Sequence, residues 1–282
     1  MKWNVLLCMV GLASAVLGQA PKGDETDLAA AGWTSEVFKN VGDVELRLWV
    51  LKPEGVTADT PVPGMVFFYG GGWKSRSMVH FQKQGEHLAK QGMVVVLPDY
   101  RSEALYGGTP FDCVEDAKSA MRYVRANAQR LGIDPDRLAA GGGSAGGHLA
   151  AATATVPGLN AATDDRSVSC VPNALVLFNP VYDNGPDGYG YERVGERYQE
   201  ISPLHNLRKG TPPTIVFLGS NDKLIPVSTA EAYEAKMKEV GSRCDTHIYE
   251  GEGHGFFNRA PHYEDTLAKM DAFLESLGYL EK

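Results

Sequence analysis

Short apolar runs alternate with helix-length segments along most of this chain, and this alternation limits the available folds more than any other feature. The apolar runs that indicate strands lie at residues 44–51, 64–69, 93–97, 137–140, 173–178, 214–218 and 246–249. The segments that indicate helices lie at residues 81–91, 111–131, 144–155, 227–240 and 263–277. Strands separated by helices are joined by crossovers, and right-handed crossovers place helices on both faces of a parallel sheet. The sequence therefore predicts an α/β fold with a mostly parallel central sheet.

The segment 181–211 interrupts this alternation. It carries four tyrosines among glycines and charged residues, namely Tyr182, Tyr189, Tyr191 and Tyr198. An insertion of this length in an α/β domain is often functional. A chain of 282 residues is long enough for one large domain. We therefore expect a single domain over residues 19–282, with 181–211 as a small cap-like insertion.

The first 18 residues have the plan of a secretory signal peptide. Lys2 is their only charge, an apolar run follows at 5–17, and Val16 and Gly18 place small residues before a cleavage site at Gln19. The alternative is a membrane anchor, but the apolar run is short for a membrane-spanning helix. We expect the peptide to be removed and the protein to be secreted or periplasmic.

The formal net charge of −8 argues against nucleic acid and anionic membranes as partners.

Three cysteines follow the expected signal peptide, Cys113, Cys170 and Cys244, and their spacing matches no metal motif. Cys170 and Cys244 precede strands that should have another strand between them, which is too far for a disulfide. We therefore expect reduced thiols, although whether any two of the three cysteines form a disulfide stays an open question. The sequence does not fix the oligomeric state.

A candidate nucleophile lies in the run Gly142-Gly143-Ser144-Ala145-Gly146, between a short strand and an Ala-rich helix. This G-x-S-x-G pattern places a serine on a strained strand-to-helix turn, where larger neighbours would clash. The helix N-terminus also favours negative charge that develops beside Ser144. The alternative interpretation is a glycine-rich turn that only lets the helix pack closely.

A serine hydroxyl needs a base, and His254 is the best candidate among seven histidines. It lies in Gly253-His254-Gly255, directly after the last predicted strand, where flanking glycines let a loop carry the imidazole toward the serine. Since His254 must be neutral to accept a proton, we expect activity to fall in acid. His148 is interpreted as structural. The remaining histidines have no distinctive setting: His80, His87, His205, His247 and His262.

The base in turn needs a carboxylate that fixes its tautomer. Asp222 follows the strand at 214–218 and precedes His254, as the chain order serine, acid, histidine requires. Two rivals remain, Asp183 after the preceding strand and Glu252 just before His254. The sequence favours Asp222.

The run Tyr69-Gly70-Gly71-Gly72-Trp73 follows the strand at 64–69. Glycines here let backbone N–H groups turn toward a reacting carbonyl, so we expect Gly70 and Gly71, with Ala145, to form an oxyanion hole. The alternative of a phosphate-binding loop is weak, because no lysine and threonine follow in Walker order.

Together these motifs resemble the esterase/acetylesterase branch of the α/β-hydrolases related to hormone-sensitive lipase. The resemblance runs from about residue 44 to the C-terminus, and it also rests on Asp99-Tyr100-Arg101, interpreted here as structural. The run from Asn179-Pro180 to Glu192-Arg193 further resembles secreted bacterial acetyl xylan esterase-like enzymes. One departure is Tyr69, which stands where the family has a histidine that braces the oxyanion loop.

The resemblance implies a serine esterase that removes short acyl groups, acetate first, from carbohydrates such as xylan, without cofactor or metal. Candidate substrate-binding residues are Tyr69, Trp73, Tyr189 and Tyr191, with the hypothesis that the tyrosines of 181–211 stack on sugars. For Trp73 two interpretations stay open, lining the acyl pocket or capping the core. The alternatives are a short-chain carboxylesterase or lipase acting on other esters, a serine peptidase, and a non-catalytic carbohydrate-binding protein.

Overall fold

The computed structural model describes residues 22–281, and in it eight strands form one sheet in the order β1-β2-β4-β3-β5-β6-β7-β8. The strands β3 to β8 run parallel to one another, whereas β2 pairs antiparallel with both β1 and β4. This confirms the predicted α/β class with a mostly parallel sheet. The strands are β1 (Thr34–Val41), β2 (Val44–Leu51), β3 (Val62–Phe68), β4 (Val94–Pro98), β5 (Ile133–Gly143), β6 (Ala174–Phe178), β7 (Thr214–Gly219) and β8 (Cys244–Tyr249).

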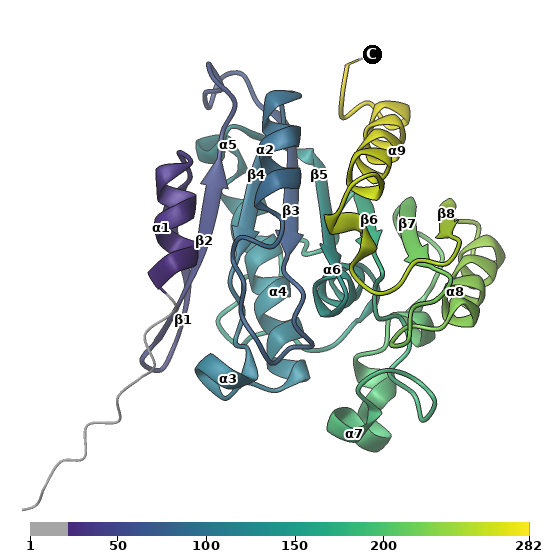
Figure 1. The fold of residues 1–282 in the computed structure, drawn as a ribbon. Coiled ribbons are helices and arrows are strands. Elements are labelled where there is room, and N and C mark those ends of the chain that lie inside the picture. The colour runs from purple at the N-terminus through teal and green to yellow at the C-terminus, as the bar shows by residue number, and fades with distance from the viewer. Residues whose placement is uncertain (1–21, 282) are drawn as a thin grey trace, which may run out of the picture.

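Helices cover both faces of the sheet, with α2 and α9 together on the nearer face in Figure 1. Because β4 and β5 lie on opposite sides of β3, right-handed crossovers place α2 on one face and α4 and α6 on the other. The α-helices are α1 (Lys22–Ala30), α2 (Gln82–Lys90), α3 (Glu103–Tyr106), α4 (Pro110–Ala126), α5 (Ala128–Leu131), α6 (Ala145–Thr155), α7 (Tyr191–Val194), α8 (Val227–Glu239) and α9 (His262–Ser276). Within residues 22–281, no helix is both long and apolar enough to cross a membrane.

The central strands are buried on both faces, which explains why they read as continuous apolar runs. Each large apolar side chain that leaves water in this way stabilises the fold by about 1.5–3 kcal/mol. The sequence missed α1 and β1, and it joined α4 and α5 into one helix. The expected signal peptide lies outside the described residues.

The insertion 181–211 lies beyond the carboxyl ends of the parallel strands, at the end of the molecule where Figure 1 labels α7. Besides α7 it contains only the short 3-10 turns η1 (Gly195–Glu200) and η2 (Leu204–Asn206). The three cysteines of the described chain are free, with Cys113 and Cys170 buried and Cys244 partly buried.

Candidate active site

Ser144 lies at the tip of the turn between β5 and α6, with a backbone φ of +55° and ψ of −122°. A positive φ with this ψ is strained for a residue with a side chain, and such strain is typical of functional sites. The turn also needs Gly146, because a Cβ atom there would lie 2.1 Å from the Phe68 carbonyl oxygen. The close passage of α6 over the end of β3 therefore explains why Gly146, two residues after Ser144, is a glycine.

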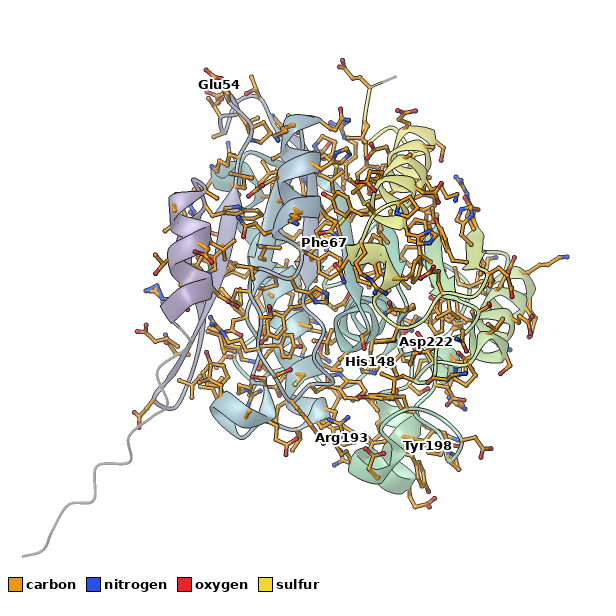
Figure 2. The ribbon with its side chains drawn as sticks, in the orientation of Figure 1. Glu54, Phe67, His148, Arg193, Tyr198 and Asp222 are labelled. Atoms are coloured by element: carbon orange, nitrogen blue, oxygen red, sulfur yellow. The ribbon has the colours of Figure 1, made fainter. Side chains whose placement is uncertain are left out.

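The structure brings His254 and Asp222 to Ser144 in a hydrogen-bonded line. The Nε2 atom of His254 lies 2.9 Å from Ser144 Oγ, and its Nδ1 atom lies 2.7 Å from Asp222 Oδ2. The three residues come from the loops after β5, β8 and β7. Such loops meet at the carboxyl edge of a parallel sheet, where α/β sites are built. Figure 2 shows Asp222 at this end of the molecule.

The carboxylate of Asp222 is buried and held from two sides. Burial alone would raise its pKa, but the hydrogen bonds from His254 and from the amides of Leu224 and Ile225 hold the pKa below its ordinary value. The two amides donate to Oδ1 over 2.8 and 3.0 Å, which leaves Oδ2 for His254. Asp222 is therefore ionised at neutral pH and accepts a hydrogen bond from the Nδ1–H group of His254.

The rival carboxylates are engaged elsewhere. Glu252 Oε1 lies 3.0 Å from Nε2 of His262, and Asp183 Oδ1 accepts the Gly185 amide over 2.7 Å. Neither carboxylate makes a hydrogen bond to His254 among the described residues.

Asn179, which sequence reasoning did not single out, supports the histidine loop. Its Oδ1 atom accepts the amide of Gly255 over 3.0 Å, and its Nδ2 atom lies 3.4 Å from Nε2 of His254. Asn179 directly follows β6 and has a positive φ of 34°. A short polar residue in the left-handed region after a central strand is the signal that could have identified it.

The expected oxyanion hole needs one correction. The amide of Gly70 is not free, because it donates to Nδ1 of His80 over 2.9 Å. Within residues 22–281, the amides of Gly71, Gly72 and Ala145 donate to no protein acceptor. Gly72 has a φ of +62°, and a Cβ atom on it would lie 2.9 Å from the Tyr189 hydroxyl. The unpaired amide donors are therefore those of Gly71, Gly72 and Ala145, whereas the Gly70 amide is bound to His80.

The hydroxyl of Ser144 opens into a cavity of about 340 Å³. Its wall combines the glycine loop with Tyr189, Leu224 and Phe257. A cavity of this size suits a small ligand, and its lining combines apolar side chains with polar ones such as Lys74, Ser75 and Asn179. The arrangement as a whole can carry out acyl transfer to a serine.

Comparisons with known proteins give the family of this chain. Residues 50–174 match the family described as BD-FAE, and residues 181–282 match the dienelactone hydrolase family. The structure of Thermogutta terrifontis esterase 2 phosphoramylated by tabun superposes with a TM-score of 0.86 at 41% identity, covering 89% of this chain and 97% of that chain.

This chain belongs to the α/β-hydrolase esterases. Esterase LipC of Mycobacterium tuberculosis is 31% identical over 70% of this chain and 53% of its own length. The acetylxylan esterase of Xylanibacter ruminicola is 28% identical over 70% of this chain and 42% of its own length. The chain thus spans about half the length of the curated relatives it matches.

Two of the expected substrate-binding residues are buried in this esterase and do not line the cavity. Tyr69 is 3% exposed, stacks on Tyr100 at 4.1 Å and donates its hydroxyl to Asp99 over 2.7 Å. Trp73 is 1% exposed and packs against His148. Both side chains turn inward from the glycine loop, so they support that loop instead of touching substrate.

The other two expected substrate-binding residues, Tyr189 and Tyr191, lie in different surroundings. Tyr189 lines the cavity, whereas the Tyr191 hydroxyl bonds to Glu196 on the outer side of the insertion. The insertion is also joined to the glycine loop by Arg193. Its guanidinium donates to the Gly72 carbonyl and lies 4.9 Å from the centre of the Trp73 ring. Figure 2 labels Arg193 in the segment beyond the sheet end.

His148 is structural, as its geometry shows. It is fully buried, its Nδ1 atom accepts from Trp73 Nε1 over 3.3 Å, and its Nε2 atom donates to the Ile201 carbonyl over 3.0 Å. Burial lowers its pKa to about 4, against smaller opposing effects of hydrogen bonds to Ile201 and Asn184. The ring is therefore neutral in the folded protein at pH 6.

We expect this buried histidine to make the folded protein less stable in mild acid. Between pH 6.5 and about 4 the unfolded chain binds a proton at His148 that the folded chain does not. Stability falls by up to about 1.4 kcal/mol per pH unit through this window, or about 3 kcal/mol from this group. Urea unfolding at pH 7 and pH 4.5 should therefore show a smaller loss for His148→Gln than for wild type. An identical loss in both proteins would contradict the assignment.

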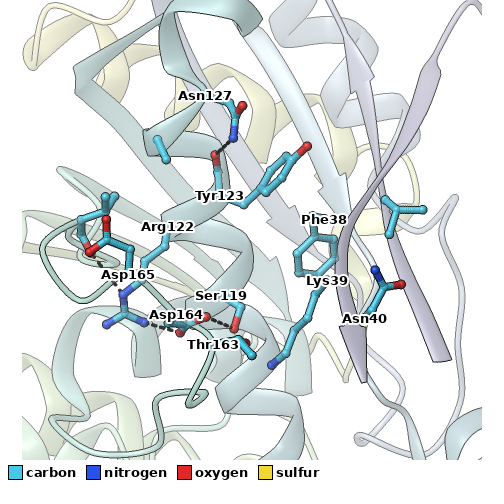
Figure 3. Close-up of a pocket in the computed structure, with 13 residues that line it drawn as sticks. Phe38, Lys39, Asn40, Ser119, Arg122, Tyr123, Asn127, Thr163, Asp164 and Asp165 are labelled. Carbon is cyan, nitrogen blue, oxygen red and sulfur yellow. Dashed lines mark hydrogen bonds and ion pairs between the residues drawn. The ribbon is translucent and has the colours of Figure 1, made fainter. Parts of the chain in front are cut away.

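A second cavity, of about 460 Å³, lies away from Ser144 between β1, α4 and the loop at 160–168 (Figure 3). Both of its basic side chains are paired, Arg122 with Asp164 over 2.8 Å and Lys39 with Asp116 over 2.7 Å. No histidine or cysteine lines it. In the described part of the chain, no cluster of acidic, histidine and cysteine side chains is arranged to hold a metal ion.

Proposed function

We propose that this chain is a serine ester hydrolase that removes short acyl groups, acetate first, from carbohydrates such as xylan. The observation that carries the ester hydrolase is the line from Asp222 through His254 to Ser144, with distances of 2.7 and 2.9 Å. His254 takes the Ser144 proton as Oγ attacks the ester carbonyl. The amides of Gly71, Gly72 and Ala145 stabilise the oxyanion.

His254 then protonates the leaving alcohol, and the acyl group stays on Ser144. A water molecule that gives its proton to His254 attacks this acyl-enzyme, and the acid leaves as Ser144 regains its proton. Asp222 stays ionised and stabilises the imidazolium in each half-reaction. These steps need no cofactor and no metal.

Two observations support a short acyl group. The cavity at Ser144 is small, about 340 Å³, with Phe257 and Leu224 among its apolar side chains. Structures of Thermogutta terrifontis esterase 2, about 40% identical to this chain, contain propionate or butyrate. The acetylxylan esterase relative and the aromatic face of Tyr189 support a carbohydrate on the alcohol side.

A general short-chain carboxylesterase is the second candidate. The diversity of the esterase relatives favours it, because they include Esterase LipC and probable isoprenylcysteine methylesterases. The two candidates share the same chemistry and differ in the alcohol that leaves.

The distinguishing experiment measures acetate released from acetylated xylan and acetylated oligosaccharides beside 4-nitrophenyl acetate. In Tyr189→Ala we expect kcat/KM on the oligosaccharides to fall about tenfold more than on the aryl ester, which corresponds to ~1.4 kcal/mol of lost contact. The physical reason is that an oligosaccharide offers several rings that can lie along Tyr189, whereas the aryl ester has only one.

Tyr191→Ala is the matched control, because it removes a tyrosine of the same insertion that does not line the cavity. The kcat/KM of Tyr191→Ala on both substrates should equal that of wild type. Equal losses on both substrates in Tyr189→Ala would remove the argument for a sugar site. Turnover of aryl esters alone by wild type would favour the general carboxylesterase.

We also propose that the enzyme is exported after removal of residues 1–18. The charge pattern and apolar run of these residues support this. Mass spectrometry of the protein from its natural host should then find Gln19 at the N-terminus outside the cytoplasm. A cytoplasmic chain that retains these residues would exclude export.

A further inference from the structure

Tyr69 precedes the three glycines of the oxyanion loop and turns inward, where its ring stacks on Tyr100 and its hydroxyl donates to Asp99. The Tyr69 hydroxyl is thus engaged below the loop, and the Gly70 amide is held by a different side chain. His80, ten residues beyond Gly70, brings its Nδ1 atom to 2.9 Å from the Gly70 amide. We propose that His80 is a positioning residue that fixes the oxyanion loop by accepting this hydrogen bond, an inference that rests on the proposed ester hydrolysis.

The contact is close and specific. A Cβ atom on Gly70 would lie 3.0 Å from Cε1 of His80 and 2.9 Å from the Gly143 carbonyl oxygen, so the loop is held tightly between the imidazole and the serine turn. The His80 ring is itself fixed by its neighbours Phe81 and Phe257, at ring-centre distances of 4.8 and 6.0 Å. A fixed acceptor on a packed ring is suited to hold a glycine loop that has little rigidity of its own.

The protonation state of His80 agrees with this part. Only a neutral ring with its proton on Nε2 can accept at Nδ1. Burial, with a smaller effect of the nearby His254, lowers the pKa of His80 to about 4. The acceptor is therefore present at the neutral pH where His254 works as a base.

The consequence for the reaction follows from the neighbouring amides. With the Gly70 amide turned to His80, the amides of Gly71 and Gly72 find no protein acceptor within the described chain, and both residues line the cavity beside Ser144. Oxyanion donors are effective when they are already oriented before the charge develops. Loss of the His80 acceptor should hence lower kcat and leave KM nearly unchanged, because the substrate carbonyl gains charge only in the transition state.

The test compares His80→Asn with His80→Leu, two side chains of similar size and shape. The Asn oxygen occupies the same position along the side chain as Nδ1 and can accept the Gly70 amide, whereas Leu places a methyl group there. We expect kcat for 4-nitrophenyl acetate to fall about 10²-fold in His80→Leu and to stay within about threefold of wild type in His80→Asn. A packing role would give the opposite order, because Leu suits the contacts with Phe81 and Phe257 better than Asn does.

Amide hydrogen exchange of the peptide that contains Gly70 gives a second readout that needs no turnover. Exchange at this peptide should be faster in His80→Leu than in His80→Asn and wild type, with His80→Ala as a second acceptor-free variant if the Leu protein does not fold. Equal exchange in all variants, or equal loss of kcat in the Asn and Leu proteins, would overturn the proposal. If wild type hydrolyses no ester, the proposed function fails, and the exchange measurement still decides whether His80 holds the loop.

Discussion

Ser144→Ala should abolish turnover of 4-nitrophenyl acetate, with kcat lowered about 10⁵- to 10⁶-fold, the scale seen when the nucleophile of a serine enzyme is removed. The substitution deletes the only hydroxyl within hydrogen-bond distance of Nε2 of His254 among the described residues. The fold should stay intact, because the Ser144 backbone amide still donates to the Phe178 carbonyl over 2.9 Å. Thermal unfolding within a few degrees of wild type would establish this.

Covalent labelling tests the role of Ser144 as nucleophile without a measurement of turnover. Thermogutta terrifontis esterase 2 is phosphorylated by paraoxon. If Ser144 is the nucleophile here, its Oγ atom attacks the phosphorus of paraoxon, nitrophenolate leaves, and the intact mass rises by one diethylphosphoryl group. The Ala variant should gain no mass under the same conditions. More than about 1% residual turnover, or labelling of the variant, would mean that another nucleophile carries the reaction.

Asp222→Asn should lower kcat about 10⁴-fold, although the new side chain has the same size. Oδ1 of Asp222 accepts the amides of Leu224 and Ile225, so the oxygen of an introduced amide group must stay on that side. Its NH₂ group then faces His254 and donates to Nδ1, which forces the imidazole proton onto Nε2. In that tautomer His254 cannot accept the proton of Ser144.

Glu252→Gln and Asp183→Asn are the matched controls, because they neutralise the two rival carboxylates without touching His254. Both should retain wild-type kcat. A large loss in Glu252→Gln with little loss in Asp222→Asn would assign the acid to Glu252. The stability of Asp222→Asn should also be measured by urea unfolding. The variant lacks the carboxylate that forms an ion pair with protonated His254, so the free energy of unfolding can change as well as kcat.

The elements that the sequence predicted well are those whose signal is local. The central strands are apolar on both faces, and the turn at Ser144 carries its glycines in five consecutive residues. Asp222 and His254 each follow a strand end, so the order of strands is enough to bring them together. For these parts, chain pattern and three-dimensional position coincide.

The missed elements depend on contacts between distant residues. The strand β1 lies at the sheet edge, and its one buried side chain is Lys39, whose ammonium group pairs with Asp116 over 2.7 Å and with Glu115 over 3.1 Å. A lysine reads as exposed unless its partners are known. Likewise, nothing in the sequence around the four tyrosines of the insertion tells which one lines the cavity, so the sequence does not distinguish Tyr191 from Tyr189.

The contact between Arg193 and the Gly72 carbonyl has a consequence for redesign of this enzyme. Through it, the segment that contributes Tyr189 to the cavity and the glycine loop that we propose binds the oxyanion share one support, together with the Trp73 ring. An exchange of residues 181–211 for the corresponding segment of another hydrolase would thus change the rate on every substrate, the smallest aryl ester included. A chimera built to alter selectivity alone would have to keep the arginine and its place over the indole.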